Sequence, residues 1–355
     1  MAASQARVGS DDDDSSRPSN PRIQDVARRA GVAIGTVSNV LNNPHLVTEQ
    51  TRLKVEAAIA ELGFVRNSAA RTLAARRTDT VGLILIDIGN SLFVDIARGA
   101  ESAAGQAQLK LLLANSDSTR TKQDNYLELF DQARVAGVLL TPLEEPLEMA
   151  HAVLGHGRPV VLVIATSPDP LTCGVMVNEE LGGYLAATHL LEEGARRLVF
   201  LAGFPELRLI RRRLAGVERA VAEAGASLSV VEAPNLQIGT GREVGCQLLV
   251  SQSVDGPVDG LVCPSDLLAV GVIQAATELG IRVPDELMVV GYDDNHFASE
   301  SSIPVSSVSL PGYRMGELAI ELLLEEIDQG SAHVQRTIML DPHLIPRRST
   351  LKSPL

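Results

Sequence analysis

The sequence predicts two parts of different fold class: a small all-α helix-turn-helix head, followed by an α/β body of two similar parallel-sheet subdomains. Between residues 21 and 66, apolar residues recur at helical spacing and glycines separate the helices. From Val81 onward, short apolar runs alternate with helical patterns in two consecutive series. At 355 residues, the chain is long enough for two or three domains with substantial cores.

Composition and charge limit the class of protein. The chain is 45% apolar and 21% charged, which is typical of globular proteins. No apolar run approaches the roughly 18 residues of a membrane span, and the N-terminus lacks a secretory apolar core, so we expect a cytoplasmic protein without a membrane partner. Cys173, Cys246 and Cys263 are far apart and show no metal-ligand spacing. We expect buried thiols in a reducing compartment, no metal and no cofactor.

The N-terminal segment, residues 1–20, places Asp11–Asp14 among serines, prolines and an asparagine. This composition predicts a disordered acidic tail, to which we assign no function.

The head begins with two short predicted helices. Val26, Ala27 and Ala30 mark the buried face of the first, and Gly31 ends it because glycine readily adopts positive φ. Val37, Val40 and Leu41 give the second helix its buried face. The residues left facing outward are Ile34, Gly35, Ser38, Asn39 and Asn42. This pattern predicts a helix-turn-helix, with an ordinary helical hairpin inside a larger core as the alternative.

A third helix and a hinge complete the head. Thr48 is placed to cap a helix that Gly63 ends, with Val55 on its buried face. Residues 67–78 then form a short predicted helix and linker, capped by Asn67. A helix of this length does not hold alone in water, so we interpret it as a hinge that folds on DNA.

The net charge of −13 is distributed unevenly. Residues 21–78 hold nine Lys/Arg and four acids, a net charge of +5, and residues 1–20 hold two Arg and four Asp, a net charge of −2. The remaining residues therefore carry −13 − 5 + 2 = −16. A basic head on an acidic body indicates that only the head meets phosphates.

The body pattern predicts eight strands separated by helices. The apolar runs of the first series are 81–86, 109–114, 138–140 and 160–164, and those of the second are 198–202, 228–231, 260–263 and 288–291. Alternation of this kind predicts parallel sheets covered on both faces, with a ligand between two subdomains at the carboxyl ends of the strands.

Catalytic signatures are weak. Residues 239–245 are close to a dinucleotide fingerprint, but the last glycine spacing is one residue too long, so we interpret the segment as a loop and helix start. Asp293 and Asp294 follow a predicted strand, where they are better placed as acceptors for ligand hydroxyls than as an acid/base pair. We therefore expect a protein that is not an enzyme.

Several motifs together carry a resemblance to a known family. In the head they are Ile-x-Asp-Val-Ala (23–27), Ala-Gly-Val (30–32), Thr-Val-Ser-Asn-Val-Leu-Asn (36–42) and Asn67 with Ala70, Arg71 and Leu73. In the body they include Asn-Ser-Asp (115–117), Arg-Leu-Ala-Gly (213–216) and Val-Val-Gly-Tyr-Asp-Asp (289–294). In order and spacing, residues 22–350 resemble the lac repressor/gal repressor (LacI/GalR) family of bacterial transcriptional regulators.

The resemblance implies a periplasmic-binding-protein-like body in which the chain crosses between subdomains three times. It divides the chain into a head at 21–66, a hinge at 67–78 and a body at 79–350. Subdomain one is expected at about 79–165 and 310–340, and subdomain two at about 166–309 and 341–350. It also implies a set of DNA-binding residues: Ile34, Gly35, Thr36, Ser38, Asn39, Asn42, Arg66, Asn67, Ala70 and Leu73. Leu73 matches a leucine that wedges into the minor groove.

For the effector, the resemblance places Arg213 and Asp293 in the cleft, on opposite sides of one pocket. The other matching positions are Leu92, Phe93, Thr141, Ser265 and Asp266. The sequence departs from the family pattern at Ala33, where a serine cap is usual, and at Ile164–Ala165, where an aspartate often ends the fourth strand. Thr240 stands near the usual place of an aromatic platform.

We therefore expect a homodimeric (or tetrameric) transcription factor, a repressor rather than an activator. Its expected partners are double-stranded, palindromic operator DNA and a small-molecule effector such as a sugar, a nucleoside or a similar metabolite. A sensor protein without a DNA-binding role is the alternative, and the basic head argues against it. A nucleotide-dependent dehydrogenase is disfavoured by the faulty glycine motif.

Overall fold

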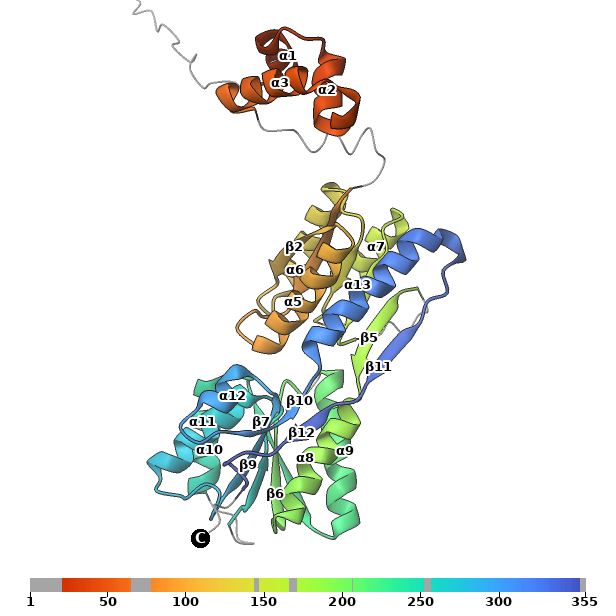
Figure 1. The fold of residues 1–355 in the computed structure, drawn as a ribbon. Helices are drawn as coiled ribbons and strands as arrows, with labels where there is room; N and C mark the ends of the chain where they lie inside the picture. The colour runs from red at the N-terminus through yellow and green to blue at the C-terminus, as the bar shows by residue number, and fades with distance from the viewer. Residues whose placement is uncertain are drawn as a thin grey trace, which may run out of the picture. The chain divides into compact units, whose positions relative to one another are not determined.

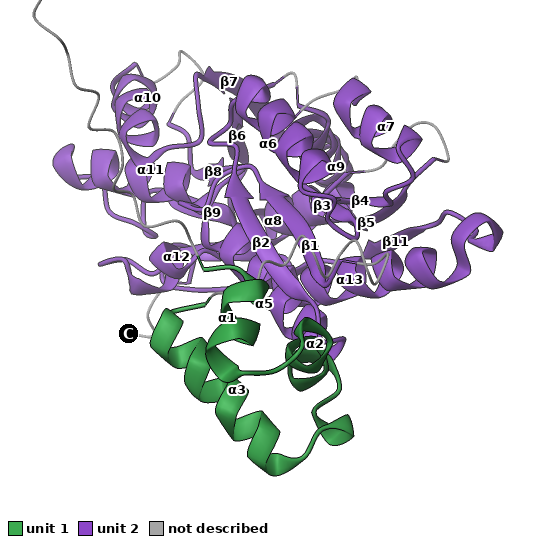
Figure 2. Cartoon of the chain, turned by 90° about the horizontal axis from the view of Figure 1, so that it is seen from above, with its two compact units in different colours: residues 1–77 green, residues 78–355 purple. Residues whose placement is uncertain are grey.

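The computed structural model describes residues 21–64, 78–143, 147–165, 171–205, 207–251 and 257–351. The chain divides into two compact units, residues 1–77 and 78–355, coloured separately in Figure 2. The predictions of an acidic tail and a hinge helix fall on residues outside these ranges, as do four of the predicted DNA-binding residues: Arg66, Asn67, Ala70 and Leu73.

The head is a cluster of three α-helices. They are α1 (Ile23–Ala30), α2 (Ile34–Asn42) and α3 (Glu49–Leu62), with a short 3-10 helix, η1 (Pro44–Leu46), between the last two. Val26, Val37 and Val55 are fully buried at the centre. Gly31 and Gly63 adopt left-handed φ of 68° and 62° at the ends of α1 and α3, as the sequence predicts.

Subdomain one is a six-stranded parallel sheet in the order β11-β5-β4-β3-β1-β2. Its strands are β1 (Thr80–Leu85), β2 (Lys110–Asn115), β3 (Val138–Leu140), β4 (Val160–Val163), β5 (Cys173–Val177) and β11 (Thr337–Leu340). Helices α5 (Ser91–Gln106) and α13 (Gly312–Gln329) lie side by side on it in Figure 1. Helices α6 (Arg120–Gln132) and α7 (Glu148–Gly155) pack on a second core cluster with alternate strand residues. A 3-10 turn, η2 (Gly330–Ala332), follows α13.

Subdomain two repeats this plan with the order β12-β10-β9-β8-β6-β7. Its strands are β6 (Arg197–Gly203), β7 (Ser227–Ala233), β8 (Gly260–Val262), β9 (Met288–Asp293), β10 (Ser306–Ser309) and β12 (His343–Ile345), and β12 alone pairs antiparallel among them. Its helices are α8 (Glu179–Glu192), α9 (Arg208–Ala224), α10 (Ile238–Val250), α11 (Asp266–Glu278) and the short α12 (His296–Glu300). Residues of β6 alternate between two core clusters, so the sheet is buried on both faces.

All eight predicted strands are present, and each end lies within two residues of its prediction. Four strands were not predicted from the sequence: β5, β10, β11 and β12. The expected first crossing near residue 165 is wrong, because β5 pairs with β4 and β11 and so extends subdomain one to Val177. The chain crosses again between β10 and α13 and between β11 and β12, which gives three crossings in the described chain.

Glycines set the close approach of one helix pair in each subdomain. A Cβ atom at Gly316 of α13 would lie 2.0 Å from the Ile96 carbonyl oxygen of α5. In the same way, a Cβ at Gly216 of α9 would lie 1.9 Å from the Glu180 carbonyl oxygen of α8. Only glycine fits at these crossings, and the second one fixes the position of the first turns of α9, where Arg213 lies.

Among the described helices, none is long and apolar enough to cross a membrane.

Candidate DNA-binding face and effector cleft

Helix α2 presents one face to solvent. Val37 and Val40 point into the head core, whereas Ile34, Gly35, Asn39 and Asn42 are exposed, as the sequence predicts. Ile34 keeps 47% of its surface exposed, although it is a large apolar residue. An exposed isoleucine beside asparagines is the composition expected of a helix that reads bases, because an apolar group contacts thymine methyls and amides pair with adenine.

The two ends of α2 differ from the middle. Ala33 precedes the helix and makes no side-chain cap, so the first turn leaves its backbone N–H groups available to an anion. Thr36 and Ser38 are half-buried, and the Asn42 Nδ2 donates to Ser38 Oγ at 3.2 Å. The candidate positions therefore lie on one helix, with Ile34, Gly35, Asn39 and Asn42 exposed and Thr36 and Ser38 half-buried.

Most arginines of the described head are engaged by its own acids. Arg29 pairs with Glu61 at 2.5 Å and links α1 to α3, and Arg52 pairs with Glu56 at 3.0 Å along α3. Residues 21–64 hold five Lys/Arg and four Asp/Glu, a net charge of +1, so most of the predicted positive charge of the head belongs to positions 65–77.

In the body, the predicted effector residues gather at the carboxyl ends of strands. Thr141 directly follows β3, Ser265 and Asp266 begin α11 after β8, and Asp293 ends β9. Leu92 and Phe93 lie in the first turn of α5 after β1. This is the edge at which parallel sheets bind ligands, as predicted.

Arg213 lies at the centre of a buried polar network. Its guanidinium is 4% exposed and donates to both oxygens of Glu179, at 2.7 and 3.3 Å, and to the Pro264 carbonyl oxygen at 2.6 Å. It also stacks over the Tyr292 ring, 3.6 Å from the centroid, and the Tyr292 hydroxyl donates to Glu179 at 2.9 Å.

The expectation that Arg213 and Asp293 lie on opposite sides of one pocket is wrong. Both belong to subdomain two, and they form a direct ion pair with an Nη2–Oδ1 distance of 3.6 Å. The physical reason is burial: two opposite charges on adjacent elements of one subdomain are stabilised by pairing with each other. Glu179, which the sequence analysis did not identify, supplies the second carboxylate.

Burial and neighbouring charges set the ionisation of this network. Burial raises the pKa of Asp293, and the adjacent Arg213 and the Asn90 amide oppose that rise. Burial also lowers the pKa of Arg213, but Glu179 and Asp293 more than reverse this effect, so its pKa is raised overall. Arg213 therefore stays charged throughout the physiological range.

Asp266 is the second buried carboxyl group at the cleft edge. It is 1% exposed, accepts from the Asn295 N–H at 2.6 Å through Oδ2, and leaves Oδ1 without a hydrogen-bond partner among the described residues. Burial raises its pKa well above the ordinary value, against the opposing hydrogen bonds of Ser307 and Asn295.

Direct contacts join the two subdomains at this edge. The Asn90 Nδ2, in the β1–α5 loop, donates to Asp293 Oδ2 at 2.8 Å, and the Asn295 Nδ2 donates to Asn90 Oδ1 at 3.2 Å. The His296 N–H donates to Ser91 Oγ at 3.1 Å. Asp293 therefore connects subdomain two to subdomain one through Asn90, which the sequence analysis had not singled out.

The side chains of the other predicted effector residues make contacts within the fold. Leu92 and Phe93 belong to the main core cluster. The Thr141 hydroxyl donates to the Ile84 carbonyl oxygen, and the Ser265 hydroxyl caps α11 and donates to the Leu236 carbonyl oxygen. All seven predicted effector residues are thus buried, and most of their polar groups already have partners.

A cavity of about 780 Å³ opens between the two subdomains, close to the first crossing. Subdomain one contributes Ile164, Ala165 and Met339, and subdomain two contributes polar groups of two helix starts: Asn178, Glu179, Glu180, Arg208, Arg211 and Arg212. None of the seven predicted effector residues is among the described residues that line it. Glu179 connects the two sites, because it lines the cavity and binds Arg213.

Some of the residues that line this cavity could have been found from the sequence. Ile164–Ala165 was identified as a departure in the cleft wall, and Arg211–Arg212 directly precede Arg213. Three further cavity residues were not predicted: Asn178, Glu179 and Glu180. They follow β5, a strand that was not predicted from the sequence.

Comparisons with known proteins agree with this architecture. Residues 22–67 match the model of bacterial regulatory proteins of the lacI family, and residues 187–350 match a periplasmic binding protein-like domain. The transcriptional repressor PurR of Photobacterium profundum is 30% identical over 331 residues, which cover 92% of this chain and 98% of that protein. The regulator RegA of Clostridium saccharobutylicum is 32% identical over 332 residues, with 93% and 99% covered.

Among solved structures, the lac repressor dimer bound to operator and the anti-inducer ONPF is 26% identical, with a TM-score of 0.79 over 94% of this chain and all of that one. These relatives are matched over nearly their whole length, in both the head and the body. The chain therefore belongs to the LacI family of bacterial regulatory proteins, as a DNA-binding transcriptional repressor and not an enzyme.

Proposed function

We propose that the protein binds a palindromic operator as a homodimer in the cytoplasm, and that a small polar effector in the cavity between the subdomains modulates this binding. The exposed face of α2 carries the first half of the proposal. Ile34, Gly35 and Asn39 form a row of one apolar, one small and one amide-bearing position on a helix whose opposite face is buried.

The cavity supports the second half. Its walls come from both subdomains, so a ligand inside it contacts both and changes the free energy of their arrangement. Arg211 and Glu180 supply charges suited to a polar metabolite, whereas Met339 and Ile164 supply apolar surface. We therefore favour a sugar, a nucleoside or a similar metabolite as effector.

A binding-site selection on the full chain tests the DNA half. Asn39→Ala should change the selected sequence, because an amide on the exposed face pairs with a base edge. Lys54→Ala is the matched control: Lys54 is exposed on α3 and reaches at most phosphates, so this variant should keep the preferred sequence and lower the salt slope by at most about one. An unchanged selection profile for Asn39→Ala would remove α2 as the reading helix.

The hinge residues extend this proposal on the strength of the family pattern. If Leu73 wedges into a base step, Leu73→Ala should cost about 1–3 kcal/mol of operator affinity and reduce DNA bending. Arg66→Ala should weaken binding to all sequences about equally. Operator DNA that Leu73→Ala bends as much as the wild type would contradict the wedge.

Operator titrations with and without a panel of pentoses, hexoses, disaccharides, nucleosides and nucleobases test the effector half. By linkage, the operator and the effector alter each other's affinity by one factor, for which a coupling of about 1–3 kcal/mol is typical. Arg211→Ala, at the cavity wall, should reduce the response while effector-free operator binding stays intact. A full response in Arg211→Ala would place the effector elsewhere.

The same titrations distinguish the proposed function from its alternatives. A sensor without a DNA-binding role would show no salt-dependent binding to any palindrome. An activator would bind the palindrome but increase transcription from a purified template.

A further inference from the structure

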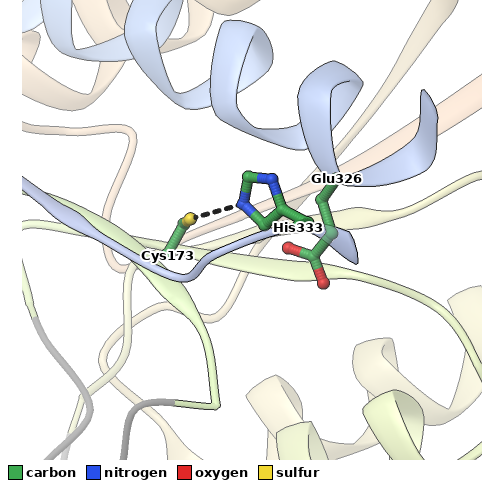
Figure 3. A group of neighbouring side chains, drawn as sticks. All are labelled: Cys173, Glu326 and His333. Atoms are coloured by element: carbon green, nitrogen blue, oxygen red, sulfur yellow. Dashed lines mark hydrogen bonds between the residues drawn. The ribbon is translucent and has the colours of Figure 1, made fainter. Parts of the chain in front are cut away.

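A cluster of three metal-ligand side chains lies in subdomain one, and none of the three is among the described residues that line the effector cavity. Cys173 begins β5, Glu326 lies in the last turn of α13, and His333 lies between η2 and β11 (Figure 3). One ligand atom from each residue lies within 4.8 Å of the other two. The sequence hides this cluster, because Cys173 stands 153 positions before Glu326.

The imidazole of His333 is oriented for coordination. Its Nε2 lies 3.2 Å from Cys173 Sγ, and its Nδ1 lies 3.3 Å from Gln329 Oε1. An amide oxygen only accepts, so Nδ1 carries the proton and Nε2 directs its lone pair at the thiol. A hydrogen bond from the second ring nitrogen to an outer acceptor is the arrangement that fixes metal-binding histidines in proteins.

The sulfur atom is prepared in the same way. Cys173 is fully buried, and the Arg336 backbone N–H donates to its Sγ at 3.4 Å. This donor favours the thiolate that coordination to a metal requires, and it opposes the burial that raises the pKa of the Cys173 thiol.

Two buried oxygens at this place have no hydrogen-bond partner among the described residues. They are Glu326 Oε2 and Gln335 Oε1. Native proteins rarely leave buried acceptors without a donor, and a cation is one group that satisfies them. Nearby Arg336 does not fill this role, because it pairs with Glu325 at 2.7 Å.

We propose that Cys173, Glu326 and His333 bind a Zn²⁺ ion. In a tetrahedral zinc site with bonds of about 2.0–2.3 Å, neighbouring ligand atoms are separated by roughly 3.3–3.7 Å, close to the Sγ–Nε2 distance here. The thiol loses its proton on binding, so the thiolate and the carboxylate together balance the charge of the ion. A water molecule completes the coordination.

The ion would join the edge of the first sheet to the end of α13. Cys173 belongs to β5, which pairs with β11, and His333 is four residues before β11 begins. The chain makes its third crossing directly after β11. Zinc would thus stabilise the strand from which that crossing departs, because an ion that binds only the folded state raises its stability.

A cobalt titration of the full chain tests the proposal. The protein is stripped with a chelator under a thiol-free reductant and titrated with Co²⁺ alone, and Zn²⁺ is then added. We expect one equivalent of Co²⁺ to give thiolate-to-metal charge-transfer absorption with tetrahedral visible bands, and Zn²⁺ to abolish both. Cys173→Ser should remove the charge-transfer band, whereas Cys246→Ser, on a half-buried cysteine of α10, should keep it.

A second pair of variants keeps the test independent of the buried cysteine. Glu326→Gln preserves shape and should weaken Zn²⁺ binding by at least about 10-fold and remove the rise in Tm on adding zinc. Glu325→Gln, on the neighbouring residue that pairs with Arg336, should bind Zn²⁺ as the wild type does. A wild type without charge-transfer absorption would overturn the proposal, as would unchanged zinc affinity in Glu326→Gln.

Discussion

Removing the guanidinium of Arg213 is expected to destabilise the body, rather than only to abolish a ligand response. The side chain is 4% exposed and interacts with Glu179, Asp293, Tyr292 and the Pro264 carbonyl group. Arg213→Ala therefore leaves two carboxylates buried without a cation, since the Glu179 and Asp293 side chains are only 6% and 7% exposed.

The expected loss in the free energy of unfolding follows from leaving these two carboxylates without a cation. Removing one partner of a buried ion pair typically costs about 3–5 kcal/mol, because the remaining charge is desolvated and unpaired. For a domain of 150–250 residues, each kcal/mol lowers the Tm by roughly 2–4 °C. The Tm of the variant should accordingly fall by roughly 6–20 °C at neutral pH.

Calorimetric melting of the full chain, with Arg212→Ala as control, measures this effect. Arg212 lies on the same helix, is 56% exposed and pairs with Glu180 at 3.3 Å, so its removal should change the free energy of unfolding by less than about 1 kcal/mol. Effector-independent operator binding by the folded fraction should persist in both variants.

The pH dependence of the stability lost in Arg213→Ala identifies the cause of that loss. Arg213 opposes the rise that burial imposes on the pKa of Asp293, so the variant raises that pKa further. A carboxyl group whose folded pKa exceeds its unfolded pKa destabilises increasingly as pH rises through the folded pKa. The deficit of Arg213→Ala should therefore shrink as pH falls from neutrality toward the ordinary carboxyl range. If Arg213→Ala had the same Tm as Arg212→Ala at every pH, this reasoning would be refuted.

Three further predictions follow from burial and close packing. Asp266→Asn should raise the free energy of unfolding at pH 7 by about 1–3 kcal/mol, because it removes an ionisable group whose charged form burial destabilises. Since burial raises the pKa of Asp266, the gain should shrink as pH falls, and a gain independent of pH in urea titrations would contradict this. Gly216→Ala should lower the free energy of unfolding by about 1–3 kcal/mol or more, because the added Cβ clashes with the Glu180 carbonyl oxygen. Gly239→Ala, whose added Cβ meets nothing within 4 Å, should leave the free energy of unfolding unchanged in the same thermal melting experiments. Gly35→Ala also meets nothing within 4 Å, so the head should stay folded by circular dichroism while its operator preference changes; a preference identical to that of the wild type would place Gly35 outside the DNA contact.

Local sequence determined the head. Its helices end at Gly31 and Gly63 and are patterned by Val26, Val37 and Val55, and the structure agrees at each of these positions. Capping and helical periodicity act over three or four residues, so they are legible in the chain itself. The exposed face of α2 follows directly, because the face opposite a buried stripe is fixed by the helical repeat.

The strands of the body were predicted from short apolar runs in the sequence. Strands β1–β4 and β6–β9 have such runs, whereas β10 is Ser306-Ser-Val-Ser309 and is buried through tertiary pairing with β9 and β12. β11 and β12 have only four and three residues. β5, Cys173-Gly-Val-Met-Val177, is an apolar run of five residues that was not predicted as a strand, and this omission displaced the expected first crossing.

The sites depended most on tertiary structure. The family resemblance predicted that Arg213 and Asp293 belong to one polar site, but not that they pair with each other or that Glu179 shares Arg213. The same holds for Cys173, Glu326 and His333, which a strand, a helix and a connecting segment bring together. Sequence determines what each element buries, because that pattern is periodic along the chain; which charges neutralise each other depends on distances between elements far apart in the chain, and only the packed fold sets these distances.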